Sequence, residues 1–177
     1  MSLLQTIAPD AATGELAQIY AGIRQGFGSI PAAFQSLSPS PTLLRQMIER
    51  IGYYMQHPRL SPALLASIRM LVSTQTHCQY CIDFNAGMLI NMLGWTPEQV
   101  AAAQADPAAA NLPQREKAML LFVLAATRDS RSVTGADLDA LRALDWTDTD
   151  ILEAAGYGAQ MVASDILLNA FKVERDF

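Results

Sequence analysis

Apolar residues recur along most of the chain at intervals of three and four, the spacing that places side chains on one face of a helix. Two such helices are predicted before residue 58, separated by the turn-rich segment 26–31 and the Ser-Pro repeat at 38–41. Their expected buried positions are Leu16, Ile19, Tyr20 and Ile23 in the first helix and Leu44, Met47, Ile48, Ile51 and Met55 in the second. No segment shows sustained strand-type alternation, so the pattern predicts an all-α protein.

Caps and helix breakers predict further helices after residue 58. Ser61 followed by Pro62 is a hydroxyl cap with proline at the first helical position, and Thr96 with Gln99 forms a capping box. The segment 118–126 is apolar on every side and is expected to be fully buried. The helices are expected to start at Ser61, near Cys78 (ending before Gly94), at Thr96, near Ala118, at Thr134 and at Thr147. The last helix is expected to bury a stripe made of Ile151, Ala155, Ala159, Val162, Ile166 and Ala170.

A short motif occurs twice at an offset of 51 residues. The sequence Leu-Gly-Trp-Thr at 93–96 is matched by Leu-Asp-Trp-Thr at 144–147, and the same offset aligns the helix that begins at Ser61 with the apolar segment 118–126. This repeated motif predicts an internal two-fold repeat in which only one half carries two cysteines. The alternative is that both tryptophans are ordinary caps of surface helices.

The length, the composition and the net charge place the chain among globular proteins. A chain of 177 residues fits one domain, which we expect to span 1–177, with 1–58 as an N-terminal helical extension and 59–177 as the core. Half of the residues are hydrophobic and 16% are charged, which excludes the disordered class. The net charge of −5 comes without a cluster of lysine or arginine, so neither nucleic acid nor a membrane surface is an expected partner.

The same features bear on location. The first ten residues carry no basic residue ahead of an apolar stretch, so no secretory signal is predicted. The longest strongly apolar run, 118–127, is shorter than the roughly 20 residues that span a bilayer. We therefore expect a soluble, cytoplasmic protein. In the reducing cytosol two cysteines rarely form a permanent disulfide.

Cys78 and Cys81 carry the candidate chemistry. Residues three apart lie on one face of a helix with β-carbons about 5 to 6 Å apart, close to the spacing of a disulfide, and a helix start stabilises the thiolate that attacks peroxides and disulfides. The alternative is a pair of small core residues. Zinc is a poorer reading, because a structural site takes four ligands and the only histidines are His57 and His77, the latter facing a different side of the helix from Cys78. Neither metal nor cofactor is predicted.

The residues around this pair resemble a known family. The stretch LVSTQTHCQYCIDFN at 71–85, followed by LGWTPEQV at 93–100, is similar to the core of the alkylhydroperoxidase D-like (carboxymuconolactone decarboxylase) family, and flanking segments resemble its longer peroxidase-related members. The resemblance covers nearly the whole chain. It implies an oligomeric helical bundle in which Cys81 attacks a small hydroperoxide or disulfide and Cys78 resolves the product, with an unidentified thiol as reductant.

The chain departs from the family pattern at two positions. Family members carry a histidine four residues after the second cysteine and a glutamate twelve before the first, which form a proton relay; here those positions are Asn85 and Ala66. Asn85 can form hydrogen bonds but cannot shuttle a proton at neutral pH. His77 is the nearest titratable residue and Asp83 fits the family pattern, so these two and Asn85 are the candidate supporting residues. Ordinary surface positions at a helix start explain His77 and Asp83 equally well.

Three functions remain open from the sequence. The first is a thiol-dependent oxidoreductase of the peroxiredoxin or alkylhydroperoxidase type, which reduces hydroperoxides or exchanges disulfides. The second is a catalytically degenerate relative that acts as a binding or scaffold protein, a reading motivated by Ala66 and Asn85. The third, a lactone decarboxylase, is least favoured because such relatives generally lack the cysteine pair. For each of them the family resemblance and the high apolar content predict a homo-oligomer.

Overall fold

The computed structural model describes residues 2–176, which form helices and turns without a strand. The predicted all-α class is thereby confirmed for this part of the chain. Contacts divide the chain into two compact units, one made of the residues up to 56 with those from 167 onward, the other of residues 57–166. The sequence-based division at residue 58 did not anticipate that the C-terminal residues belong to the first unit. Among the described helices, none is long and apolar enough to cross a membrane.

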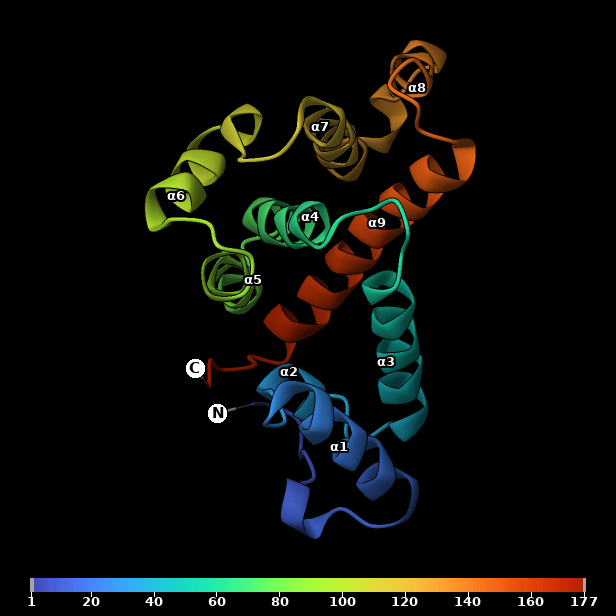
Figure 1. The fold of residues 1–177 in the computed structure, drawn as a ribbon. Coiled ribbons are helices and arrows are strands. Elements are labelled where there is room, and N and C mark those ends of the chain that lie inside the picture. Colours follow the sequence, from blue (N-terminus) through green and yellow to red (C-terminus); the bar gives the residue numbers. More distant parts are fainter. Residues whose placement is uncertain (1, 177) are drawn as a thin grey trace. The chain divides into compact units, whose positions relative to one another are not determined.

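The first unit is built from helices α1 (Gly14–Phe27), α2 (Ala32–Gln35) and α3 (Pro41–Met55), preceded by a short 3₁₀ turn, η1 (Pro9–Ala11) (Figure 1). Its C-terminal segment is tied to it by a hydrogen bond from the Leu3 N–H to the Phe171 carbonyl (2.9 Å). Met55 is 74% exposed, so its predicted burial is wrong, because it is the last residue of α3 and lies beyond the core cluster. That cluster consists of Leu16, Tyr20, Ile23, Ile30, Phe34 and Leu44.

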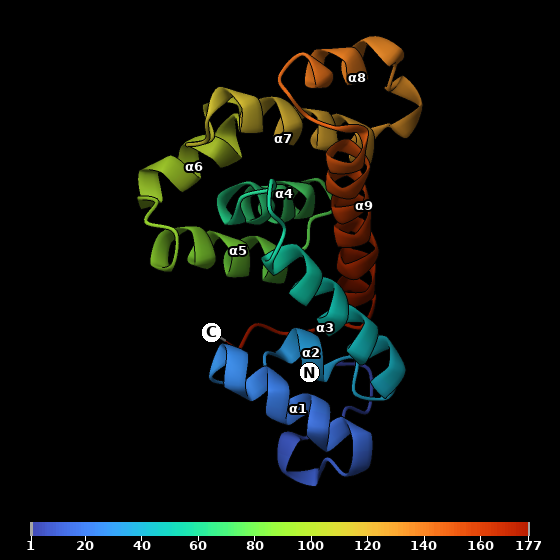
Figure 2. The same ribbon diagram turned by 45° about the vertical axis from the view of Figure 1, so that its right-hand side comes forward.

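The second unit holds the cysteine pair. Its elements are α4 (Pro62–Gln75), α5 (Gln79–Asn91), α6 (Pro97–Ala105), η2 (Pro107–Ala109), α7 (Gln114–Arg128), η3 (Ser130–Ser132), α8 (Gly135–Arg142) and the larger part of α9 (Asp148–Ala170). Both ribbon views show α4 between α5 and α7 (Figures 1 and 2). Helical spacing predicts that α4 buries Leu64, Ile68, Leu71 and Val72, and all four are buried. The predicted cap is also present, since the Ser61 hydroxyl accepts the Leu64 N–H (3.1 Å).

Two predictions about buried faces are wrong. Leu121 is 41% exposed, so the apolar segment 118–126 is not fully buried, because α7 packs on α4 with one side only. Along α9 the residues Ala159, Ile166 and Ala170 are exposed. Alanine recurs all around α9, so the sequence is compatible with two apolar stripes. The stripe that is buried contains the carboxylate of Asp165, which made this face appear polar in the sequence. The buried positions of α9 are Asp150, Ile151, Ala154, Tyr157, Gly158, Asp165 and Leu168.

The repeated Leu-x-Trp-Thr motif has one local geometry in both copies. Gly94 and Asp145 both have positive φ angles, 72° and 65°. The tryptophans that follow are buried, Trp95 at 5% and Trp146 at 2% exposure, so they are core residues and not surface caps. The predicted capping box of Thr96 is present. A repeat over the whole of each half remains a prediction.

Gly158 allows α9 to approach α7 closely, because a β-carbon there would overlap Val123 Cγ1 and lie 3.1 Å from Thr127 Cγ2. We expect Gly158→Ala to overpack this contact and lower the free energy of unfolding by about 1–3 kcal/mol, measured by urea denaturation. The control is Gly22→Ala on α1, where nothing lies within 4 Å; that change should stabilise by roughly 0.5–1 kcal/mol. An unchanged Gly158→Ala variant would contradict the close approach.

Candidate functional site

A sharp turn between α4 and α5 places the cysteine pair. His77 adopts a left-handed backbone conformation (φ 56°), which few non-glycine residues do, and the Cys78 N–H then donates to the Ser73 carbonyl (3.0 Å). This turn brings the chain back toward α4, so that Cys78 becomes the N-cap residue of α5 and Cys81 lies in its first turn. The helix start predicted near Cys78 is therefore present.

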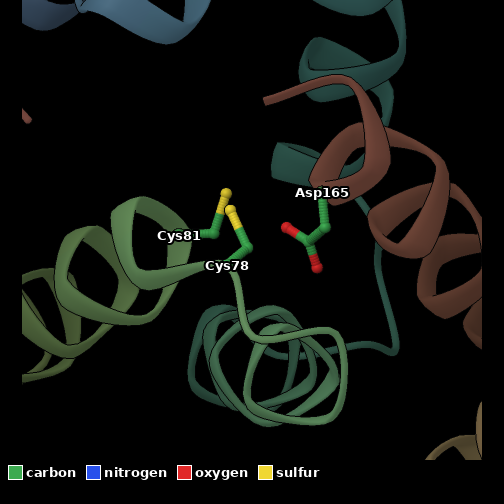
Figure 3. Close-up of side chains that lie close together, drawn as sticks. All are labelled: Cys78, Cys81 and Asp165. Carbon is green, nitrogen blue, oxygen red and sulfur yellow. The ribbon is translucent and has the colours of Figure 1, made fainter. Parts of the chain in front are cut away.

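The two thiols are free and almost completely buried, with Cys78 at 1% and Cys81 at 6% exposure. Figure 3 shows their sulfur atoms side by side, with the carboxyl of Asp165 turned toward them from α9. The two sulfurs and a carboxyl oxygen all lie within 4.8 Å of one another. The site thus combines two thiols and one carboxyl group away from solvent.

Asp165 is fully buried and is held by four hydrogen-bonding groups. The Ser73 hydroxyl donates to Oδ1 (3.1 Å) and the Thr76 hydroxyl donates to Oδ2 (2.6 Å), and both cysteine thiols interact with the same carboxyl. Among residues 2–176, no lysine, arginine or histidine forms an ion pair with it. Burial therefore raises the pKa of Asp165, and the hydrogen bonds offset this effect only in part.

The two thiols have unlike affinities for their protons. Cys81 donates a hydrogen bond to Cys78, which lowers the pKa of Cys78 although burial opposes the change. The same hydrogen bond and the burial raise the pKa of Cys81. The first proton therefore leaves from Cys78, and the resulting single negative charge is shared within a hydrogen-bonded pair. The family resemblance gives the attack to Cys81, so attack requires that its proton move to Cys78.

Asn85 links the backbone of Cys81 to the side chain of Arg69 by hydrogen bonds. Its side-chain amide donates to the Cys81 carbonyl (2.7 Å), and its oxygen accepts from the Arg69 guanidinium (2.6 Å), which also donates to the Tyr157 hydroxyl (2.7 Å). Asn85 is 2% exposed and Ala66 is fully buried. Where the family pattern has two relay groups, this chain therefore has an amide and a methyl group, with a cation beside the amide.

His77 and Asp83, the two other candidate supporting residues, lie at the surface of this turn and helix. The His77 side chain is exposed, and what this residue contributes is the left-handed turn before α5. Asp83 accepts a hydrogen bond from the Gln79 side chain one helical turn earlier (2.7 Å). Neither residue is among the groups that contact the Asp165 carboxyl.

Cys78, Cys81 and Asp165 are close enough to be considered as a metal site. A tetrahedral zinc site with protein ligands alone takes four of them, and the described residues bring three together here. Both carboxyl oxygens of Asp165 also accept hydroxyl hydrogen bonds already. Within residues 2–176 the cluster therefore lacks the fourth protein ligand of a closed structural zinc site.

The sequence reasoning missed Asp165, Ser73 and Thr76. Asp165 lies 84 residues after Cys81 in the chain, so no local spacing connects the two. One signal was present, namely a lone carboxylate within the mostly apolar segment 161–168 near the C-terminus. A charge on an apolar helical face is either paired or functional, and here it faces the thiols.

The raised pKa of Asp165 predicts a pH effect on stability. Above about pH 4 the unfolded chain releases this proton, whereas the folded protein keeps it until the raised pKa is reached. The folded state therefore loses stability relative to the unfolded state as the pH rises through this window. Asp165→Asn cannot titrate at this position. The difference in free energy of unfolding, variant minus wild type, should therefore become more positive from pH 4 to pH 7, whatever its value at pH 4.

The control for this measurement is Asp148→Asn, in the first turn of the same helix. Asp148 is paired with Arg142, which lowers its pKa, so the relative stability of this variant should stay flat or move in the opposite direction. Denaturant titrations at several pH values provide the comparison. Parallel pH curves for wild type and Asp165→Asn would show that the buried carboxyl has an ordinary pKa.

Comparisons with known proteins support the fold. No protein-family model and no curated protein matches the chain by sequence. Among solved structures, an uncharacterized peroxidase-related protein from Silicibacter sp. TM1040 is similar, with a TM-score of 0.87, 20% identity, and coverage of 99% of this chain and 92% of that chain. A peroxidase-related protein from Ralstonia eutropha JMP134, described as an alkylhydroperoxidase AhpD core, gives a TM-score of 0.87, 22% identity and the same coverage.

A third similar structure is the debrominase Bmp8, with a TM-score of 0.79, 17% identity, and coverage of 98% of this chain and 92% of that chain. A cysteine-to-alanine variant of Bmp8 has been solved with 2,3,4-tribromopyrrole. At these identities the likeness concerns the fold, which agrees with the family that the motifs around Cys78 and Cys81 resemble. The chain therefore has the alkylhydroperoxidase D-like fold.

Proposed function

We propose that this protein is a thiol-dependent oxidoreductase that uses Cys78 and Cys81 to reduce small hydroperoxides or to exchange disulfides. The observation that carries the proposal is the buried cluster of two free thiols at the start of α5, one of which has a lowered pKa. A thiolate is the nucleophilic form of cysteine, and a second thiol within the same turn can complete a disulfide. An external thiol, whose identity is open, would restore the reduced pair.

The reaction with a hydroperoxide follows from this arrangement. As the Cys81 sulfur attacks the terminal oxygen, its proton passes to the Cys78 thiolate, the O–O bond breaks and an alkoxide leaves. Cys81 is then a sulfenic acid. The Cys78 sulfur attacks the Cys81 sulfur, the S–O bond breaks, and the oxygen leaves as water with the proton that Cys78 held. The hydroperoxide gains two electrons, the dithiol loses two, and the alkoxide requires one further proton.

Stoichiometric hydroperoxide, added in the presence of a chelator, should remove both free thiols of the wild-type protein and lower its intact mass by that of two hydrogens. Cys78→Ser should react slowly, because the acceptor for the Cys81 proton is missing, and should stop at a single added oxygen, because Cys81 has no partner to resolve it. Cys81→Ser should keep the Cys78 thiol for much longer. These outcomes can be read by thiol titration and mass spectrometry.

If Cys81→Ser gained one oxygen and Cys78→Ser kept its thiol, Cys78 and not Cys81 would be the attacking residue. If the wild-type protein keeps both thiols, the oxidoreductase proposal is wrong, and the degenerate, non-catalytic reading motivated by Ala66 and Asn85 takes its place. The family's relay residues are absent, and general acid and base groups contribute about 10²–10⁴ in rate. A slow but complete reaction therefore agrees with the proposal.

Reductive debromination is a second candidate function, favoured by the similarity to Bmp8 over 98% of this chain. Two thiols can replace a carbon–bromine bond with a carbon–hydrogen bond, in which case the thiols form a disulfide and bromide and one proton are released. Bromide release from 2,3,4-tribromopyrrole, measured beside hydroperoxide reduction at equal enzyme concentration, distinguishes the two substrate classes.

We further propose that the protein self-associates through the exposed side of α9. Leu152, Ala159 and Ile166 are spaced by seven residues and share a helix face, and Leu152 is 73% and Ile166 58% exposed. Leu152→Glu should shift the mass measured by light scattering toward that of the monomer, whereas Glu98→Gln on the exposed start of α6 should not. A wild-type protein that is already monomeric at micromolar concentration would refute this association.

A further inference from the structure

We propose that Asp165 is the acid of the redox reaction: it holds a proton while the cysteines are reduced, gives that proton to the leaving group, and is ionised while they form a disulfide. This inference rests on the proposed dithiol function and adds a catalytic residue to it. It assigns the chemical task that Ala66 and Asn85 cannot perform.

The charge balance of the site supports this role. Once the first proton has left Cys78, the reduced thiol pair carries one negative charge, which the hydrogen bond shares between Cys78 and Cys81. A second negative charge on Asp165, within 4.8 Å and without a cation paired to it in the described part of the chain, would be unfavourable in a buried site. Oxidation removes the charge from the sulfurs. The carboxyl can then ionise, and the site again carries one negative charge.

The hydroxyl groups around Asp165 can stabilise its ionised state. Ser73 and Thr76 each donate to one carboxyl oxygen, and hydrogen bonds of this kind stabilise a carboxylate once it forms. The buried site therefore holds donors for the ionised acid without a permanent positive charge that would keep it ionised. Among the described residues, the titratable groups in contact with the carboxyl are the thiols of Cys78 and Cys81 at the start of α5, while Ser73 of α4 and its C-cap residue Thr76 contribute hydroxyls.

Proton counting agrees with the assignment. Reduction of a hydroperoxide to an alcohol and water takes two electrons and two protons. The reduced site contains one thiol proton, on Cys81, and one carboxyl proton, on Asp165, and therefore supplies both. The thiol proton leaves with the water, as described above, and the Asp165 proton neutralises the alkoxide. The products are the Cys78–Cys81 disulfide and the Asp165 carboxylate.

The decisive experiment counts protons taken up when the disulfide is reduced, using redox titration against a dithiol buffer at several pH values. Wild type should take up two protons per disulfide, a shift of the midpoint potential of about 59 mV per pH unit, while Asp165→Asn should take up one, about 30 mV per pH unit. The pH range is that in which Cys78 stays ionised. The matched control, Asp148→Asn on the same helix, should give the wild-type slope.

A second measurement needs no variant. The infrared difference spectrum between the reduced and oxidised wild-type protein should show the C=O stretch of a protonated carboxyl disappearing on oxidation. With hydroperoxide, Asp165→Asn should lose thiols about 100-fold more slowly or worse at pH 7, and the deficit should shrink at lower pH as solvent supplies the proton.

Equal slopes for wild type and Asp165→Asn, or a carboxyl band that does not change, would overturn the assignment of Asp165. Because the titration uses a dithiol buffer, it does not depend on hydroperoxide turnover. If no disulfide forms under any oxidant, the proposed function fails. If the disulfide forms with uptake of one proton in the wild-type protein, only the role of Asp165 fails.

Discussion

The chemistry proposed for this protein depends on a buried carboxyl group that lies against two thiols and has no cation paired to it among residues 2–176. A buried charge is stable only when it is paired or well hydrogen-bonded, and the interactions of Asp165 are limited to hydroxyls and thiols. In the proposed mechanism the site holds one negative charge at a time. Each added electron pair would then bring protons with it, and burial would couple electron transfer to proton transfer. This coupling requires no histidine.

A different balance holds on the other side of Cys81. There the Arg69 guanidinium is bound by Asn85 and Tyr157, which are neutral partners, and Asn85 in turn holds the Cys81 carbonyl. A histidine at position 85 would place a titratable ring against this cation, which disfavours its protonated form. The substitutions relative to the family pattern are thus consistent with the proposed role of Asp165: the side of Cys81 near Arg69 is held by hydrogen bonds to a cation, and the proposal assigns proton transfer to the side that faces Asp165.

Local sequence signals predicted the features that depend on local physics. The Ser61 and Thr96 caps, the buried face of α4 and the helix start at Cys78 were each predicted from a few neighbouring residues, and each is present. The failures occurred where packing decides between equivalent local patterns. In α9 a helix rich in alanine offers two apolar stripes, and the choice between them depends on contacts such as that of Gly158 with Val123.

The error in α9 and the missed site residue have one cause. Assigning Ile166 to the core implied that Asp165 faces solvent, because adjacent residues on a helix point in directions about 100° apart. A pattern that scores only hydrophobicity counts a buried aspartate as evidence against the correct face, although such a residue marks the functional side. Since Cys78 and Cys81 already pointed to redox chemistry and the expected relay residues were absent, Asp165 was a carboxylate in a mostly apolar part of α9 whose position needed another explanation. Consistency between chemistry and packing, more than periodicity, identifies such a residue.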